Sequence, residues 1–322
     1  MQPRRNILNR SIIITISGMA FAYVGWRLWG FQNWDAIVKT ASDRLGVFIA
    51  FTLMQIVLQV INFMLESTKW HALILTIHHQ TLRQSIWQTL GGTTVGAITP
   101  ARLGEPAGRL WGIPKEKRLK ALILGFLGGI LLSLIITIGG LTALIFFNPF
   151  QTTLSAVNLT HAAWMMALII SGIWIWHRFI RPDSLKAIIL KIQNALKMVT
   201  GTRLALLSLL TAARYICFAA QLLLWFKFFS PTTALSEIMA PLAIYYLMVT
   251  VIPSFFVADL GIRGSIGVFI FSLTGINIVA IISAIFCQWL ITTCGPTLLG
   301  SLVYLWSSEQ KNNTFVLLQQ KR

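Results

Sequence analysis

Long, continuously apolar stretches separated by short polar segments recur along the whole sequence. Each stretch is close to the ~20 residues that a helix needs to cross the hydrocarbon core of a bilayer. None shows the polar–apolar alternation of a membrane β-strand, so the pattern predicts helices. We therefore expect an all-α, polytopic bundle that forms a single integral membrane domain over residues 1–322. The predicted crossings are Ser11–Trp29, Leu45–Leu65, Leu119–Phe147, Leu159–Trp176, Leu204–Phe229 and Ile276–Trp306.

Two further apolar stretches are shorter, and each ends at a proline. Ile86–Thr99 is followed by Pro100 and is too short to cross a bilayer at 1.5 Å per residue. Ile238–Ile252 is followed by Pro253 and could cross alone. We predict that both are re-entrant broken helices beside about six full crossings, and a full crossing stays open for the second.

Basic residues lie on both sides of the first short stretch. Lys69 and Arg83 precede it, and Arg102, Arg109 and Lys115 follow it. Lys and Arg concentrate in cytoplasmic loops, so both ends of the stretch are expected to face the cytoplasm. An apolar segment that starts and ends on one side of the membrane is a re-entrant hairpin.

Composition agrees with a membrane protein. The chain is 56% hydrophobic and 11% charged, whereas an average soluble domain carries about 25% charged residues. Its net charge of +17 would suggest a nucleic-acid partner in a soluble protein. Here the basic residues lie between apolar stretches, as in cytoplasmic loops. We expect a bacterial inner-membrane protein with both termini in the cytoplasm, and no nucleic acid, metal or cofactor.

The two halves of the chain resemble each other at an offset of about 153 positions. We predict a first repeat at 45–147 and a second at 204–306. The loop charges place the entry of the first hairpin on the cytoplasmic side and that of the second on the periplasmic side, which is the inverted-repeat arrangement of many transporters. A chance likeness of two segments broken by proline and glycine is the alternative. The aligned positions are Leu82 with Leu235, Pro100 with Pro253 and Gly108 with Gly261.

Two carboxylate–arginine pairs occupy corresponding places in these repeats. Glu105 and Arg109 are four residues apart, as are Asp259 and Arg263, so each pair can share a helix face. Charges inside a bilayer are costly unless they are paired or hydrated, and such residues therefore often serve function. The arginines could hold a phosphate, and the carboxylates could bind a cationic headgroup or carry a proton. Alternatively, each pair only neutralises itself and stabilises a broken helix.

Two more arginines join this set. Arg214 lies near the middle of an apolar stretch, and Arg102 lies close to the first carboxylate pair. Either side chain could instead extend along the membrane to its surface. The candidate substrate-binding residues are Glu105, Arg109, Asp259, Arg263, Arg102 and Arg214, and the residues expected to break the helices are Pro100, Gly104, Pro253 and Gly261.

At these motifs the chain resembles the lysylphosphatidylglycerol synthase transmembrane-region family, also called flippase-like integral membrane proteins. The first match is the run Pro-x-Arg-x-Gly-Glu-x-x-x-Arg from Pro100 to Arg109, and the second is Pro253 followed by Gly261 and Arg263. Many relatives have Glu directly after this second arginine, whereas this chain has Gly264 there and an acid upstream.

The resemblance implies a role in moving a lipid with a polar head between leaflets. Aminoacyl-lipid members carry a large soluble aminoacyltransferase domain after the membrane region, whereas this sequence stops soon after Trp306. Lysyl transfer is therefore not expected. The expected partners are membrane lipids, either an anionic phospholipid or a lipid-linked headgroup. The alternatives are a membrane-embedded transferase acting on a lipid-linked substrate, such as phosphatidylglycerol aminoacylation with a separate soluble partner, and a non-catalytic scaffold of an envelope-synthesis complex.

Overall fold

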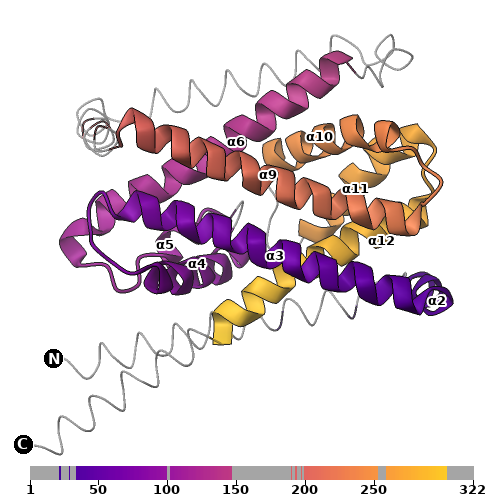
Figure 1. Cartoon of the computed structure of the whole chain (residues 1–322), viewed down its shortest axis with the longest axis horizontal. Coiled ribbons are helices and arrows are strands. Elements are labelled where there is room, and N and C mark those ends of the chain that lie inside the picture. The colour runs from indigo at the N-terminus through magenta and orange to yellow at the C-terminus, as the bar shows by residue number, and fades with distance from the viewer. Residues whose placement is uncertain are drawn as a thin grey trace, which may run out of the picture.

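The computed structural model describes residues 34–99, 102–146, 199–252 and 259–302, together with a few isolated positions. These residues form helices, as predicted, and no strand occurs among them (Figure 1). The predicted crossings Ser11–Trp29 and Leu159–Trp176 lie outside the described ranges, as do Pro100 and Pro253.

Four helices of the described residues are long and apolar enough to cross a membrane. They are α3 (Leu45–Ile74), α6 (Arg118–Phe146) with the short helix η2 (Lys115–Lys117) before it, α9 (Gly201–Phe229), and the run Ile278–Leu302. That last run comprises α12 (Ile278–Trp289), the wider turn η4 (Leu290–Cys294) and a final helical segment. These four helices match four of the six predicted crossings, while the total of six and the re-entrant topology stay predictions.

The helix α3 differs most from its predicted extent. It has 30 residues and is about 45 Å long at 1.5 Å per residue. The sequence placed its end at Leu65 and assigned Lys69 to the basic flank of the next segment. That assignment of Lys69 was wrong, because the helix continues to Ile74 and Lys69 is 2% exposed inside the protein.

The same helix is apolar on its outside and polar on its inside. Val47, Leu53, Val57 and Val60 are exposed, whereas the buried positions include the polar residues Gln55, Asn62, Glu66, Ser67 and Lys69. A soluble protein would bury the valines and leucine instead. An apolar outer surface with polar groups turned toward neighbouring helices is the pattern expected of a helix surrounded by lipid.

Hydrogen bonds between polar side chains and backbone fix α3 against α9, which runs antiparallel beside it (Figure 1). Gln55 donates from Nε2 to the carbonyl of Gln221 at 2.7 Å, and Gln221 returns a bond of 3.1 Å to the carbonyl of Gln55. Both glutamines are fully buried. Polar contacts of this kind hold helices together where no water competes for them.

The two shorter helices predicted from the repeat begin at corresponding residues. The first, α4 (Leu82–Ala97), and the second, α10 (Leu235–Val251), start at the pair of leucines that the offset aligns. The next described helix after each one begins with an acid: α5 (Glu105–Gly108) and α11 (Asp259–Phe271). The orientation of these elements relative to a membrane stays a prediction.

Side chains at the helix starts explain these boundaries. Thr81 accepts a hydrogen bond from the backbone N–H of Gln84, and the Gln84 side chain accepts one from Thr81 N–H, which forms a capping box for α4. Glu237 accepts from the N–H of Ala234 at the start of α10. Asn277 caps α12 through Val279 N–H at 2.8 Å.

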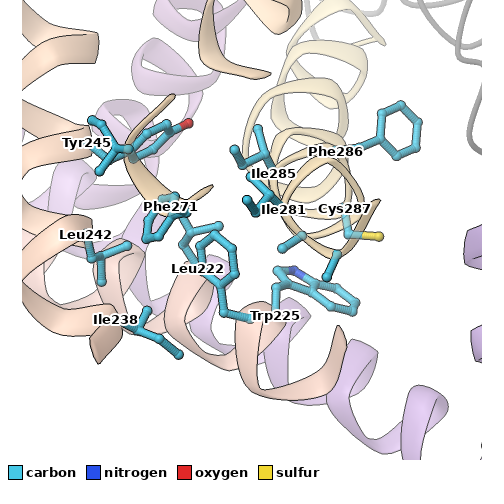
Figure 2. Close-up of a cluster of buried hydrophobic side chains, with 14 of the residues drawn as sticks. Leu222, Trp225, Ile238, Leu242, Tyr245, Phe271, Ile281, Ile285, Phe286 and Cys287 are labelled. Carbon is cyan, nitrogen blue, oxygen red and sulfur yellow. The ribbon is translucent and has the colours of Figure 1, made fainter. Parts of the chain in front are cut away.

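The largest buried apolar cluster lies in the second half, where α9, α10, α11 and α12 meet (Figure 2). Leu222 and Trp225 of α9 lie near Phe271 of α11 and Ile281 of α12, and Tyr245 of α10 extends toward the same space. The helix α2 (Trp34–Asp43), which precedes α3 in the chain, also packs against α12. Its Trp34 ring contacts the ring of Phe286 edge-on, with 5.2 Å between the centroids. The turn after α11 is the short helix η3 (Ser272–Thr274).

Candidate functional site

A single carboxylate, Glu66 of α3, contacts three cations: Lys69 of the same helix, Arg214 of α9, and Arg109 just after α5. Its Oε1 lies 2.7 Å from Arg109 Nη2, and its Oε2 lies 2.7 Å from Lys69 Nζ and 2.8 Å from Arg214 Nη1. Glu66 is 5% exposed, so these are interior contacts. A buried carboxylate requires partners that satisfy both oxygens, and here each oxygen has at least one.

The two arginines around Glu66 are fixed by further contacts. Arg214 of α9 also donates from Nε to Asn62 Oδ1 at 3.1 Å. The guanidinium of Arg109 lies over the ring of Trp70, 5.5 Å from its centroid, where the negative ring face attracts a cation. The ammonium of Lys69 donates to the backbone carbonyl of Gly128 in α6 at 3.2 Å. This network therefore links α3, α6 and α9 with the segment after α4.

Glu105 is the first residue of the short helix α5, after Gly104 at the N-cap and before Pro106. Proline is well accommodated in the first turn of a helix, and an acid there faces the positive end of the helix dipole. Its Oε1 pairs with Arg109 as predicted, and its Oε2 lies 3.5 Å from Arg102 Nε. Burial alone would raise the pKa of the Glu105 carboxyl, but Arg109 and Arg102 outweigh it and hold this pKa below its usual range.

Close packing of α5 on α4 depends on two glycines. A Cβ on Gly108 would lie 2.8 Å from the carbonyl oxygen of Gly91 and 2.9 Å from Gly92 Cα. A Cβ on Gly92 would lie 2.7 Å from Cγ of Arg109 and 2.9 Å from the Glu105 carbonyl. Only glycine permits this approach, which brings Arg109 and Glu105 against α4.

The second predicted pair also forms. Arg263 donates from Nε to Asp259 Oδ1 at 2.9 Å, and the other carboxylate oxygen accepts from Trp289 Nε1 at 3.1 Å. Asp259 is thereby fixed between α11 and α12. Gly261, expected to break this segment, lies inside α11 next to the pair, so the expectation of a helix break at Gly261 was wrong.

A cavity of about 250 Å³ opens between the two halves. Three arginines from different parts of the chain line it: Arg102 before α5, Arg214 in α9 and Arg263 in α11. Arg102 has a backbone φ of +56°, in the left-handed region that costs a non-glycine residue energy. The other lining residues are Asn62, Leu132, Ile136, Phe218, Leu222, Tyr245, Tyr246, Val249, Thr250, Ile285, Gln288, Trp289, Thr292 and Thr293.

The wider turn η4 supplies two of these residues. Thr292 and Thr293 lie within Leu290–Cys294, where the backbone departs from regular α-helix. Such local widening is frequent at functional sites, because it turns side chains to positions that a regular helix does not reach.

The structure divides the predicted site residues into two groups. Arg102, Arg214 and Arg263 line the cavity, whereas Glu105, Arg109 and Asp259 do not and instead contact other charged residues. The sequence interpretation missed Glu66, which lies just past the predicted end of the second crossing. The signal was present: Asn62, Glu66 and Lys69 follow helical spacing within a predominantly apolar helix.

Comparison with family models matches residues 11–300 to the lysylphosphatidylglycerol synthase TM region. The chain belongs to this family. The match includes both carboxylate–arginine pairs, the cavity and Glu66, and it covers the membrane region of the family. Among curated proteins and solved structures, no match is found. The protein is therefore an integral membrane protein connected with lipid metabolism or translocation. This follows from its family and from the four apolar helices of spanning length.

Proposed function

We propose that this protein moves a lipid with a polar headgroup between the two leaflets of the bacterial inner membrane. The observation that supports this proposal most strongly is the cavity, because it places three arginines among membrane-spanning helices. Cationic side chains at such depth are costly unless they serve a polar substrate or a partner. A lipid headgroup that crosses the apolar core needs such a polar site on its way.

The carboxylates have a different role in this proposal. Glu66 pairs with Arg214, Asp259 with Arg263, and Glu105 lies near Arg102, so each cavity arginine has a carboxylate beside it. These acids reduce the cost of burying the arginines and fix their directions, and they leave guanidinium groups facing the cavity. We assign Glu66, Glu105, Arg109 and Asp259 to positioning and Arg102, Arg214 and Arg263 to headgroup contact.

The place of the cavity suits alternating access. Its lining comes from α3, α6, α9, α10, α11 and α12 and from the segment before α5, so both repeats contribute to one site. Transporters built from inverted repeats have their substrate site at the repeat interface, beside broken helices. Rocking of one half against the other would then expose the same arginines to each leaflet in turn.

The test is a leaflet-accessibility assay with purified protein in liposomes that contain fluorescent phosphatidylglycerol. A membrane-impermeant reductant bleaches only the outer leaflet, so bleaching beyond half of the signal reports translocation. We expect wild type to pass this limit and the double variant Arg214→Gln with Arg263→Gln to stop at it. Arg203→Gln is the matched control, because it removes the same charge from an exposed position at the start of α9.

Bleaching that stops at half for wild type would contradict translocation of this lipid. Mass spectrometry of lipids incubated with the protein and an aminoacyl or glycosyl donor would then test the transferase alternative, which predicts a product of changed mass. If neither change occurs and both charge pairs tolerate alanine in cells, the scaffold alternative would be favoured.

A further inference from the structure

The charges that line the cavity are all of one sign. Arg102, Arg214 and Arg263 are its charged lining residues, and no Asp or Glu of the described residues joins them there. Arg214 uses Nε and Nη1 for Asn62 and Glu66, and its Nη2 has no hydrogen-bond partner among the described residues. Guanidinium donors of this kind suit the oxygen atoms of a phosphate.

The nearby carboxylates are not free to bind a cation. Both oxygens of Glu66 contact cations, and those of Asp259 accept from Arg263 and Trp289. The oxygens of Glu105 lie against Arg109 and Arg102. An ammonium group entering the cavity would therefore meet three arginines, and each nearby carboxylate is already in an ion pair with a cation.

Neutral polar groups complete the lining. Thr250, Thr292 and Thr293 belong to it, and the hydroxyls of Thr250 and Thr292 donate to the carbonyls of Tyr246 and Gln288. Gln288 Oε1 is a buried acceptor that has no hydrogen-bond partner in the part of the chain described. A buried acceptor left without a donor is costly, so a donor from a bound molecule would be favourable. A hydroxyl group of the ligand would supply it without adding positive charge.

Apolar side chains make up the rest of the cavity wall. Leu132 and Ile136 of α6 lie with Phe218 and Leu222 of α9 and Ile285 of α12. A free phosphate or sugar phosphate has little apolar surface to bury against these side chains, whereas the acyl-ester end of a lipid has apolar surface that such contacts remove from water.

We propose that the cavity selects a lipid whose headgroup carries a phosphodiester and neutral hydroxyls, and that it discriminates against a headgroup bearing an amine, such as a lysyl ester. This inference rests on the proposed function, since it takes the ligand to be a lipid that crosses between the leaflets. It departs from what the family name suggests, because lysylphosphatidylglycerol carries two amines beside its phosphate.

Binding is measured without any transport step, on the purified full chain in a neutral detergent. Short-chain phosphatidylglycerol, lysylphosphatidylglycerol and phosphatidylcholine, and soluble glycerol 3-phosphate, are each titrated while the thermal unfolding midpoint is followed. We expect phosphatidylglycerol to bind at least about tenfold more tightly than the other three, since a charge-assisted hydrogen bond contributes enough for roughly a tenfold change.

Substitutions then connect this preference to the cavity. Arg214→Gln and Arg263→Gln should each weaken phosphatidylglycerol binding about tenfold or more, with Arg203→Gln unchanged. Gln288→Leu removes the unpaired acceptor, and we expect it to reduce the preference for phosphatidylglycerol over a phosphatidic acid that lacks the glycerol hydroxyls. Each variant is compared only after its monodispersity in detergent matches wild type.

The outcomes separate this inference from the proposed function. Equal or tighter binding of lysylphosphatidylglycerol overturns the selectivity, and equal binding of glycerol 3-phosphate overturns the lipid assignment. Selective binding of phosphatidylglycerol with bleaching that stops at half would uphold the selectivity and contradict translocation. Translocation of phosphatidylglycerol without any binding preference would support translocation and contradict the selectivity.

Discussion

The region of α4 and α5 and the region of α10 and α11 begin at residues that the offset aligns, but they are stabilised in different ways. Around α4 and α5, the contacts are between charges and between small residues: α4 buries serine, threonine, glutamine and three glycines against its neighbours. Around α10 and α11, the buried residues are large and apolar or aromatic, including Ile238, Leu242, Tyr245 and Phe271. The first region depends on complete charge pairing, and the second on packing.

This difference shows how one backbone pattern can serve two purposes. Glu66 holds cations of the first region in place at the centre of the network, whereas the second has one pair whose acid is also held by Trp289. Removing a charged side chain should therefore lower the stability of the protein far more in the first region than in the second. The following predictions test that asymmetry, beginning with the largest expected effect.

Replacing Glu66 with alanine should have the largest effect on stability. It leaves Lys69, Arg109 and Arg214 without their shared carboxylate, and breaking a buried ion pair by removing one partner costs about 3–5 kcal/mol. The thermal unfolding midpoint in detergent measures the loss. Glu116→Ala, at an exposed position, is the control and should leave the midpoint unchanged. An unchanged unfolding midpoint for Glu66→Ala would contradict the claim that the first region depends on charge pairing more than the second.

A methyl group at Gly108 should separate α5 from α4. The new Cβ would meet backbone atoms of Gly91 and Gly92, which cannot move aside as a side chain can. Overpacking of this kind costs about 1–3 kcal/mol. In the second region, Gly264→Ala meets nothing within 4 Å and should be neutral or stabilise by up to about 1 kcal/mol, since alanine favours helix. Equal unfolding midpoints for the two variants would contradict the prediction.

Replacing Asp259 with asparagine should cost less than the loss of Glu66. An amide oxygen can still accept from Trp289, and Arg263 lines the cavity, where water can reach it. We expect a destabilisation of about 1 kcal/mol or less, in line with a partly exposed ion pair. The same detergent unfolding assay compares Asp259→Asn with Glu66→Gln. A larger loss for Asp259→Asn would reverse the ranking of the two regions.

Acid should abolish the contribution of Glu105 to stability. The pKa of this carboxyl is lowered in the folded protein, so its ion pairs stabilise fully above the unfolded pKa of about 4.3. The stabilisation disappears as the pH falls through the lower, folded-state pKa. The difference in unfolding midpoint between wild type and Glu105→Gln should be constant from pH 6 to 8 and shrink below about pH 4. A difference that changes between pH 6 and 8 would contradict the lowered pKa.

Much of the local structure could be predicted from the sequence. The lengths of the apolar stretches predicted both ends of α6 and α9 and the start of α3 to within a few residues, because burial in lipid requires a continuous apolar surface. The end of α3 was the exception. Spacing of four predicted both carboxylate–arginine pairs, since residues four apart share a face of any helix. The offset between the halves aligned Leu82 with Leu235, the residues at which α4 and α10 begin, although the apolar stretches had been predicted to start at Ile86 and Ile238.

Only the tertiary structure shows which charges meet across helices. Glu66 lies about 40 positions before Arg109 and about 150 before Arg214, and no local periodicity relates such distant residues. The sequence placed six residues in one group of candidates. The packing of α3 against α9 and of α5 against α4 divides that group, placing Arg102, Arg214 and Arg263 on the cavity and the other three in ion pairs behind it.

The sequence by itself thus determined that the chain is helical, that it belongs in a membrane and which charges pair within a turn. Those properties depend on composition and on spacing along one helix. The cavity and the central place of Glu66 were decided by tertiary packing, because contacts between helices depend on how glycines and polar side chains let them approach.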